Sequence, residues 1–126
     1  MNQRPRRLRK NAIVREMVAE TKLTKNMFIY PYFVVKGTNI VHPIAAMPGI
    51  SHFSVDELLK DVEKGLKIGI NKILLFGVGE DKTEDASSSY SVNSIVVKAV
   101  KALKEKFGEN IYIITDVCVC AYTTHG

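Results

Sequence analysis

The chain has 126 residues, of which 46% are hydrophobic and 25% charged, a balance that is ordinary for one globular domain and excludes a wholly disordered chain. No apolar stretch approaches the roughly 18 residues that a membrane span requires, and the first residues lack the apolar core of a signal peptide, so we expect a cytoplasmic protein. The formal net charge of +5 raises the question of a nucleic-acid partner.

The positive charge is concentrated at the amino terminus. Six basic residues precede the first acidic residue, Glu16, and the 12 that follow nearly balance 13 acidic residues. No aromatic residue is interleaved with them and no groove-reading motif follows, which disfavours nucleic acid. We expect instead a basic arm over residues 1–21 that lies on an acidic surface of a neighbouring subunit. The six residues are Arg4, Arg6, Arg7, Arg9, Lys10 and Arg15.

The first predicted elements are short. Within residues 11–21, apolar side chains at i,i+4 spacing predict a short amphipathic helix. Residues 27–35 are aromatic and β-branched, which predicts a strand whose ladder Pro31 interrupts. Residues 36–52 hold two glycines and two prolines, a composition typical of an irregular loop with turns.

A helix with a clear start follows this loop. Ser54 and Glu57 have the spacing of a capping box, and apolar residues line one face until Gly69. The continuous apolar run of residues 72–78 predicts a strand buried on both faces. The polar residues 79–94, which include Glu80 and Asp81, predict an exposed loop.

The last predicted elements are a helix and a strand. Apolar residues recur at helical spacing from Val96 to Phe107, and residues 111–120 predict a third buried strand. Strand, helix, strand, helix, strand indicates right-handed crossovers and a parallel βαβαβ unit, so residues 22–126 are interpreted as one α/β domain. The pattern leaves open a doubly wound sheet or part of a TIM (β/α)₈ barrel. No glycine-rich phosphate loop opens either helix, so a dinucleotide site is poorly supported.

The richest chemistry lies at the end of the third predicted strand. Asp116, Cys118 and Cys120 alternate there, and residues i and i+2 of a strand share one face, so both thiols are expected to point the same way. Two thiolates could bind Zn²⁺, for which His125 is the local candidate for a further ligand. Asp116 could orient an amine or a metal-bound water, or cap a loop. His42 and His52 are interpreted as solvated surface residues.

The same segment carries a resemblance to a known family. Residues 115–126, Thr-Asp-Val-Cys-Val-Cys-Ala-Tyr-Thr-Thr-His-Gly, are very similar to the zinc-cysteine segment of porphobilinogen synthases, also called 5-aminolevulinate dehydratases. Supporting matches occur in the family's order at residues 4–9, 29–34, 47–49 and 75–78. The chain therefore resembles the N-terminal part of this family.

The resemblance implies a fold and a reaction. The family forms TIM barrels whose N-terminal arm embraces a neighbouring subunit in homo-oligomers, and it condenses two molecules of 5-aminolevulinate into porphobilinogen for heme biosynthesis. By position, Cys118 and Cys120 correspond to two of three zinc-ligating cysteines. Asp116 corresponds to the active-site aspartate near the substrate amine.

The resemblance also implies what these residues lack. The family's third zinc cysteine follows directly after the histidine and glycine of residues 125–126, and its two Schiff-base lysines lie much further along. We therefore expect a truncated relative without turnover of its own, because removing the nucleophile removes the covalent route. Lys36 and Lys72 are poor substitutes, since nothing near them predicts the desolvated pocket that lowers a lysine pKa.

Two non-catalytic readings stay open. The chain could join a full-length synthase through its arm and an exposed sheet edge and modulate its assembly, because three strands cannot close a barrel and leave an apolar edge that another chain can pair with. It could also handle metal, or act in redox chemistry, through the paired thiols.

Overall fold

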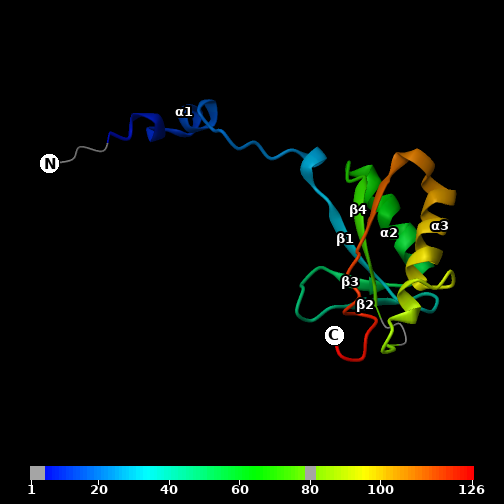
Figure 1. The fold of residues 1–126 in the computed structure, drawn as a ribbon. Helices are drawn as coiled ribbons and strands as arrows, with labels where there is room; N and C mark the ends of the chain where they lie inside the picture. Colours follow the sequence, from blue (N-terminus) through cyan, green and yellow to red (C-terminus); the bar gives the residue numbers. More distant parts are fainter. Residues whose placement is uncertain (1–4, 79–81) are drawn as a thin grey trace.

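The computed structural model describes residues 5–78 and 82–126 and contains a five-stranded sheet in the order β2-β3-β1-β4-β5 (Figure 1). Neighbouring strands from β3 to β5 pair in parallel, and β2 is antiparallel to β3. Arg4, Gly79, Glu80 and Asp81, which the sequence assigned to the arm and the polar loop, lie outside the described residues. The strands are β1 (Tyr30–Val34), β2 (Val41–Pro43), β3 (Ser51–Phe53), β4 (Lys72–Gly77) and β5 (Tyr112–Thr115).

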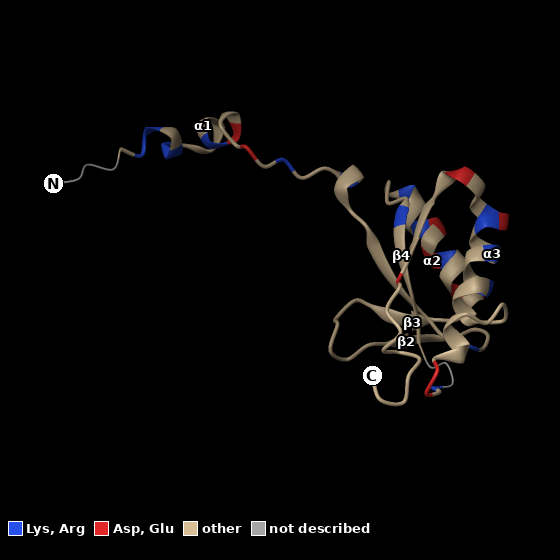
Figure 2. Ribbon diagram, viewed as in Figure 1, with Lys and Arg blue, Asp and Glu red and all other residues tan. Residues whose placement is uncertain are grey.

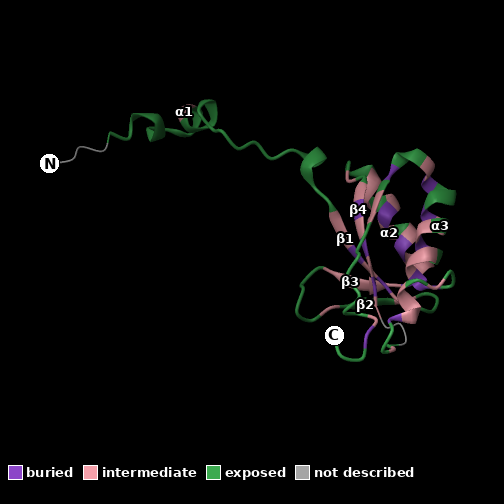
Figure 3. Ribbon diagram, viewed as in Figure 1, coloured by how far each residue is buried: buried purple, intermediate pink, exposed green. Residues whose placement is uncertain are grey.

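Two long helices, α2 (Val55–Lys67) and α3 (Ile95–Phe107), cover the same face of the sheet (Figure 1). Their apolar sides and one side of the sheet form a single core (Figure 3). Lys106 of α3 donates to Glu63 of α2 over 2.9 Å at the outer surface. The core residues are Tyr32, Val34, Leu58, Val62, Ile73, Leu75, Ile95, Ala99, Leu103, Phe107 and Ile111.

Within the part of the chain that the structure describes, the other face of the sheet carries no helix. Ile73 and Leu75 of β4 are buried under the helices, whereas the alternating Leu74 and Phe76 are only half-buried. A doubly wound sheet has helices on both faces, but a barrel has them on the outside alone. The predicted βαβαβ unit is therefore confirmed, and its one-sided packing favours a barrel wall. The prediction that residues 72–78 are buried on both faces is wrong.

The segment predicted as an irregular loop at residues 36–52 contains two strands. β2 and β3 pair as a hairpin, and β3 also pairs with the end of β1 at Phe33 and Val34. Strands of three residues are too short to show a period in the sequence, and Pro43 argued against one. Pro31 lies beside β4 only, because β3 does not extend that far.

Three predicted boundaries shift. The first helix is shorter, α1 (Ala12–Met17), and begins where the Asn11 side chain accepts a hydrogen bond from Val14 N over 2.9 Å. The first strand begins only at Tyr30, after a 3₁₀ turn at Lys25–Met27. Residues 111–120 were predicted as strand throughout, but β5 ends at Thr115. The cysteines therefore lie in a loop and not on a strand.

The start of α2 is as predicted, although its capping chemistry differs. Ser54 is the N-cap, but its Oγ accepts a hydrogen bond from Ile40 N over 2.9 Å instead of capping the helix. Buried Ser54 thus connects the helix to the residue before β2. Asp56 Oδ2 accepts from Asn39 N over 2.9 Å, which also joins α2 to this segment.

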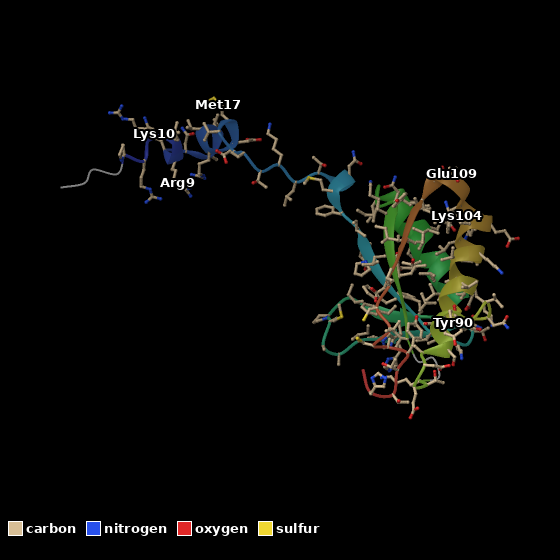
Figure 4. The ribbon with its side chains drawn as sticks, in the orientation of Figure 1. Arg9, Lys10, Met17, Tyr90, Lys104 and Glu109 are labelled. Carbon is tan, nitrogen blue, oxygen red and sulfur yellow. The ribbon has the colours of Figure 1, made fainter. Side chains whose placement is uncertain are left out.

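The arm is the least buried part of the chain. Residues 5–29 lead away from the sheet, and the basic residues of the described arm stand out along them (Figures 1 and 2). Leu8, Ile13 and Met17 are 59–76% exposed, and the labelled Arg9, Lys10 and Met17 side chains project into open space (Figure 4). The boundary of the arm at residue 21 stays a prediction. Among the described residues, no helix has the length and apolarity to cross a bilayer.

Candidate functional site

The candidate site lies in the loop that follows β5, at the carboxyl end of the parallel strands. Asp116 N donates to Leu75 O over 3.4 Å, so the ladder continues for one residue before the chain leaves the sheet. Asp116 Oδ1 then accepts a hydrogen bond from Cys118 N over 3.3 Å. The carboxylate therefore shapes the loop that carries the first cysteine, which is the capping role that the sequence left open.

The two cysteines are free, exposed and close to each other. A hydrogen bond with Cys118, followed by the charge of that side chain, raises the pKa of the Cys120 thiol. Because a negative charge on Cys120 is unfavourable beside the Cys118 side chain, the Cys120 thiol keeps its proton to a higher pH than a free thiol does. The chain thus brings the predicted pair together without the strand that the sequence suggested.

Thr83 anchors the far half of this loop. Its backbone N donates to Tyr122 O over 3.0 Å, and its O accepts from Thr124 N over 3.3 Å, around buried Thr123. The Thr83 side chain accepts from Ser87 N over 2.9 Å and so closes its own turn. The loop after β4 therefore holds the loop after β5 in place. Residues 79–94 were predicted to form an exposed loop, and this prediction is wrong at Ala86 and Ser94, which are buried.

Gly77, the last residue of β4, allows the loop to approach the strand. A Cβ atom at this position would lie 2.6 Å from Tyr122 Oη and 2.7 Å from Val96 Cγ2. Real Cβ atoms do not approach other atoms this closely, so a larger residue would force Tyr122 or Val96 to shift, and glycine lets Tyr122 and the start of α3 close over the strand end.

A cavity of about 660 Å³ opens beside the loop. The ends of β4 and β5 and the apolar Val97 and Val100 of α3 line it. Asp116, Cys118 and Lys101 are among its polar lining residues. A space of this size, apolar with a few polar groups at one side, suits a small organic molecule.

The remaining predicted ligand is not brought to the thiols. His125 is exposed, and within residues 5–78 and 82–126 no three His, Cys, Asp or Glu side chains are grouped closely enough to hold a metal. The two soft sulfur donors fit zinc, but they fill only two corners of a tetrahedral shell. Of the lysines weighed as nucleophiles, Lys36 is exposed, and Lys72 lies at the opposite end of β4 from the loop.

Sequence reasoning assigned no structural role to Thr83, Tyr122 or Gly77. A glycine at the end of an otherwise apolar strand does signal close approach of another segment, so Gly77 could have been found. Thr83 contributes mainly backbone groups to the loop, and no residue type marks such a role.

Comparison with known proteins gives a consistent result. A family model described as delta-aminolevulinic acid dehydratase matches residues 2–126. The dehydratase of Ruminiclostridium josui is 40% identical over the whole chain, which covers 61% of that protein. The dehydratase of Methanothermus sociabilis is 46% identical over 98% of the chain, which covers 38% of it. The chain thus spans less than two thirds of these relatives.

A solved structure agrees with the fold. The delta-aminolevulinic acid dehydratase (porphobilinogen synthase) of Toxoplasma gondii, in complex with the reaction product porphobilinogen, superposes with a TM-score of 0.86 and 36% identity. The match covers 98% of this chain and 35% of that one. The family match over nearly all of the residues and the one-sided α/β sheet agree, and the chain belongs to the delta-aminolevulinic acid dehydratase (porphobilinogen synthase) family.

Proposed function

We propose that residues 1–126 form the part of a 5-aminolevulinate dehydratase that supplies an active-site carboxylate, Asp116, and two zinc-ligating thiolates, Cys118 and Cys120. The observation that carries the proposal is the loop after β5, where the carboxylate shapes the backbone of Cys118 and the two thiols adjoin. The reaction that this part serves is the condensation of two 5-aminolevulinate molecules into porphobilinogen.

The role of each residue follows from its surroundings. Asp116 lines the 660 Å³ cavity, where a carboxyl group can orient the amine of a small substrate. The two thiols would hold zinc when both are deprotonated, and a bound zinc ion supplies Lewis-acid polarisation of oxygen atoms. Among the described residues, no third His, Cys, Asp or Glu is grouped with the two thiols. The third zinc ligand is therefore proposed to come from elsewhere in the complete enzyme.

These 126 residues by themselves are proposed to lack turnover. A Schiff-base nucleophile needs a desolvated lysine. Lys36 is exposed, and Lys72 lies at the far end of β4, where it donates to Asn71 Oδ1 over 3.1 Å. Neither lysine therefore approaches Asp116 in a closed pocket.

The test is porphobilinogen formation from 5-aminolevulinate by the purified chain, with zinc present, from a host whose own synthase gene is deleted. We expect no product. Product that disappears in a Lys36→Ala or Lys72→Ala variant would show that a lysine of this chain has taken the nucleophile's role and would refute this part of the proposal.

A second candidate function rests on the arm. Residues 5–29 lie away from the sheet, and their apolar side chains, including Leu8, Ile13 and Met17, are exposed among arginines. Such a surface is normally covered by a partner. The chain is proposed to join copies of itself or a full-length synthase through this arm and through the edge of β5, and the cytoplasm remains its predicted location.

Co-purification distinguishes this second role. Tagged chain is expected to retain a full-length synthase, and deletion of residues 1–10 is expected to abolish the interaction. Retention that is unaffected by the deletion would exclude the arm as the contact. The control is the Lys104→Ala variant (Figure 4). Lys104 is an exposed lysine of α3, outside the arm, so this variant also removes a positive charge but leaves the arm intact.

A further inference from the structure

The hairpin of β2 and β3 brings together two histidines that are ten positions apart in the sequence. His42 and His52 are directly opposite each other in the antiparallel pairing. Their rings are stacked, with centroids 6.2 Å apart and planes inclined by 11°. The sequence suggested two separate solvated residues, and their pairing follows only from the hairpin that the sequence did not predict.

Neighbouring side chains fix the ring of His52, and both histidine rings remain accessible to solvent. His52 packs edge-on against Phe33 of β1, with ring centroids 6.1 Å apart, and Phe33 itself stacks on Phe76 at 5.1 Å. The pair therefore stands on the face of the sheet that carries no helix, next to an aromatic platform. His42 is exposed and His52 is half-buried, so an ion from solvent can reach them.

The backbone under the pair is fixed on both sides. Ile44 N donates to Ile50 O over 2.9 Å, and Ser54 N donates to Ile40 O over 3.0 Å. These bonds lie two residues before and after the histidine pair, so the distance between the two Cα atoms is set by a regular ladder. No large rearrangement is needed to keep both side chains on one side of the hairpin.

The spacing of the rings suits a shared metal ion. Metal–nitrogen bonds of about 2.0–2.1 Å, added to the ring radius, place the centres of two imidazoles on one ion about 5–6.4 Å apart. The observed 6.2 Å lies at the wide end of that range, where the two nitrogens sit nearly opposite each other across the ion, and both near-parallel rings must turn about their side-chain torsions to point one nitrogen each toward it. Neutral imidazole is the ligand that copper, nickel and zinc share.

We propose that His42 and His52 form a two-imidazole site for a late divalent transition-metal ion, separate from the cysteine loop. Within residues 5–78 and 82–126 no third His, Cys, Asp or Glu joins them, so water fills the other positions. Because affinity at a given nitrogen site rises from nickel to copper and falls again at zinc, the site binds Cu²⁺ most tightly.

The experiment is a calorimetric titration with Ni²⁺ and then Cu²⁺ of the full chain carrying Cys118→Ser and Cys120→Ser, which removes the thiol ligands. We expect one ion per chain, bound more tightly for Cu²⁺ than for Ni²⁺. His42→Gln and His52→Gln are each expected to weaken binding at least about tenfold, since each removes one of two protein ligands. His125→Gln, at an exposed histidine elsewhere, is the matched control and is expected to change nothing.

A second measurement reports the position of the ion. An ion that bridges β2 and β3 slows hydrogen exchange at the amides of Ile44 and Ser54, which flank the pair, and this slowing is lost in the His52→Gln variant. The proposal is overturned if His42→Gln and His52→Gln bind Ni²⁺ as tightly as the parent does. It is equally overturned if His125→Gln weakens binding as much as they do, or if the two amides exchange at the same rate with and without metal.

Discussion

Replacing Gly77 by alanine tests whether the cysteine loop is seated on the end of β4. The new Cβ would lie 2.6 Å from Tyr122 Oη and 2.7 Å from Val96 Cγ2, and the valine, being β-branched, cannot rotate away freely. Overpacking of this kind costs about 1–3 kcal/mol. The loss of unfolded-state freedom on replacing glycine returns about 0.4–1 kcal/mol. With the middle of each range, about 2 kcal/mol lost and about 0.7 kcal/mol returned, the expected net loss is about 1.3 kcal/mol.

Thermal unfolding followed by circular dichroism measures this loss. For a chain of 126 residues, 1 kcal/mol corresponds to about 4 °C, so Gly77→Ala is expected to lower Tm by about 5 °C. Gly65→Ala in α2 is the matched control, because a Cβ there meets its nearest atom, Ile70 O, at an ordinary 3.6 Å. That variant is expected to gain about 0.5–1 kcal/mol from helix propensity.

A double variant shows which contact is responsible. In a Tyr122→Phe background the hydroxyl is gone, so Gly77→Ala is expected to cost less than it does in the parent chain, and the difference measures the coupling of the two positions. If Gly77→Ala leaves Tm unchanged or raises it as Gly65→Ala does, the loop does not pack on β4 as described.

Three further predictions concern the core, a strained turn and the thiols. Tyr32 Oη donates to Asp61 Oδ2 over 3.2 Å, so Tyr32→Phe is expected to cost about 1 kcal/mol in urea unfolding at pH 7. Burial, then the charge of Asp61, raises the pKa of Tyr32 above its unfolded value of about 10. Its contribution is therefore complete below about pH 10 and falls by about 1.4 kcal/mol per pH unit above that, and a parent-minus-variant difference that stays constant to pH 11 would contradict this. Ala86 adopts a left-handed conformation with φ 54°, so Ala86→Gly is expected to stabilise the chain by about 0.5–1 kcal/mol in the same assay, and a loss would refute the strain. Because Cys118 is the main cause of the raised Cys120 pKa, Cys118→Ala is expected to lower it, and an ultraviolet thiolate titration that gives an unchanged pKa would show that the thiols are apart.

The parts of the fold that could be predicted from the sequence are those in which a regular pattern of apolar residues extends over many positions. α2 and α3 each contain 13 residues with one apolar face, and β4 is a continuous apolar run, so their positions were predicted to within two residues. The hairpin of β2 and β3 was not predictable, because three-residue strands depend on pairing that local pattern does not record.

The cysteine loop shows why the site was only half predictable. Val117 and Val119 alternate with the cysteines and look like strand residues, yet Val117 is 91% exposed. The pairing of β4 with β5 ends at Leu75 and Thr115, and the loop that follows finds a hydrogen-bond partner in Thr83 instead. The identity of the site residues stays a prediction from the sequence, and their conformation depends on a neighbouring loop.

The most direct test of the account places these residues in a complete enzyme. We would replace the matching segment of the Methanothermus sociabilis dehydratase with residues 1–126 of this chain and measure porphobilinogen formation from 5-aminolevulinate with zinc present. The account predicts turnover that Asp116→Asn and the Cys118→Ser/Cys120→Ser pair each abolish, while Val117→Ala in the same loop retains it. Turnover that survives the loss of Asp116 and of both thiols would contradict the assignment of this loop to the active site.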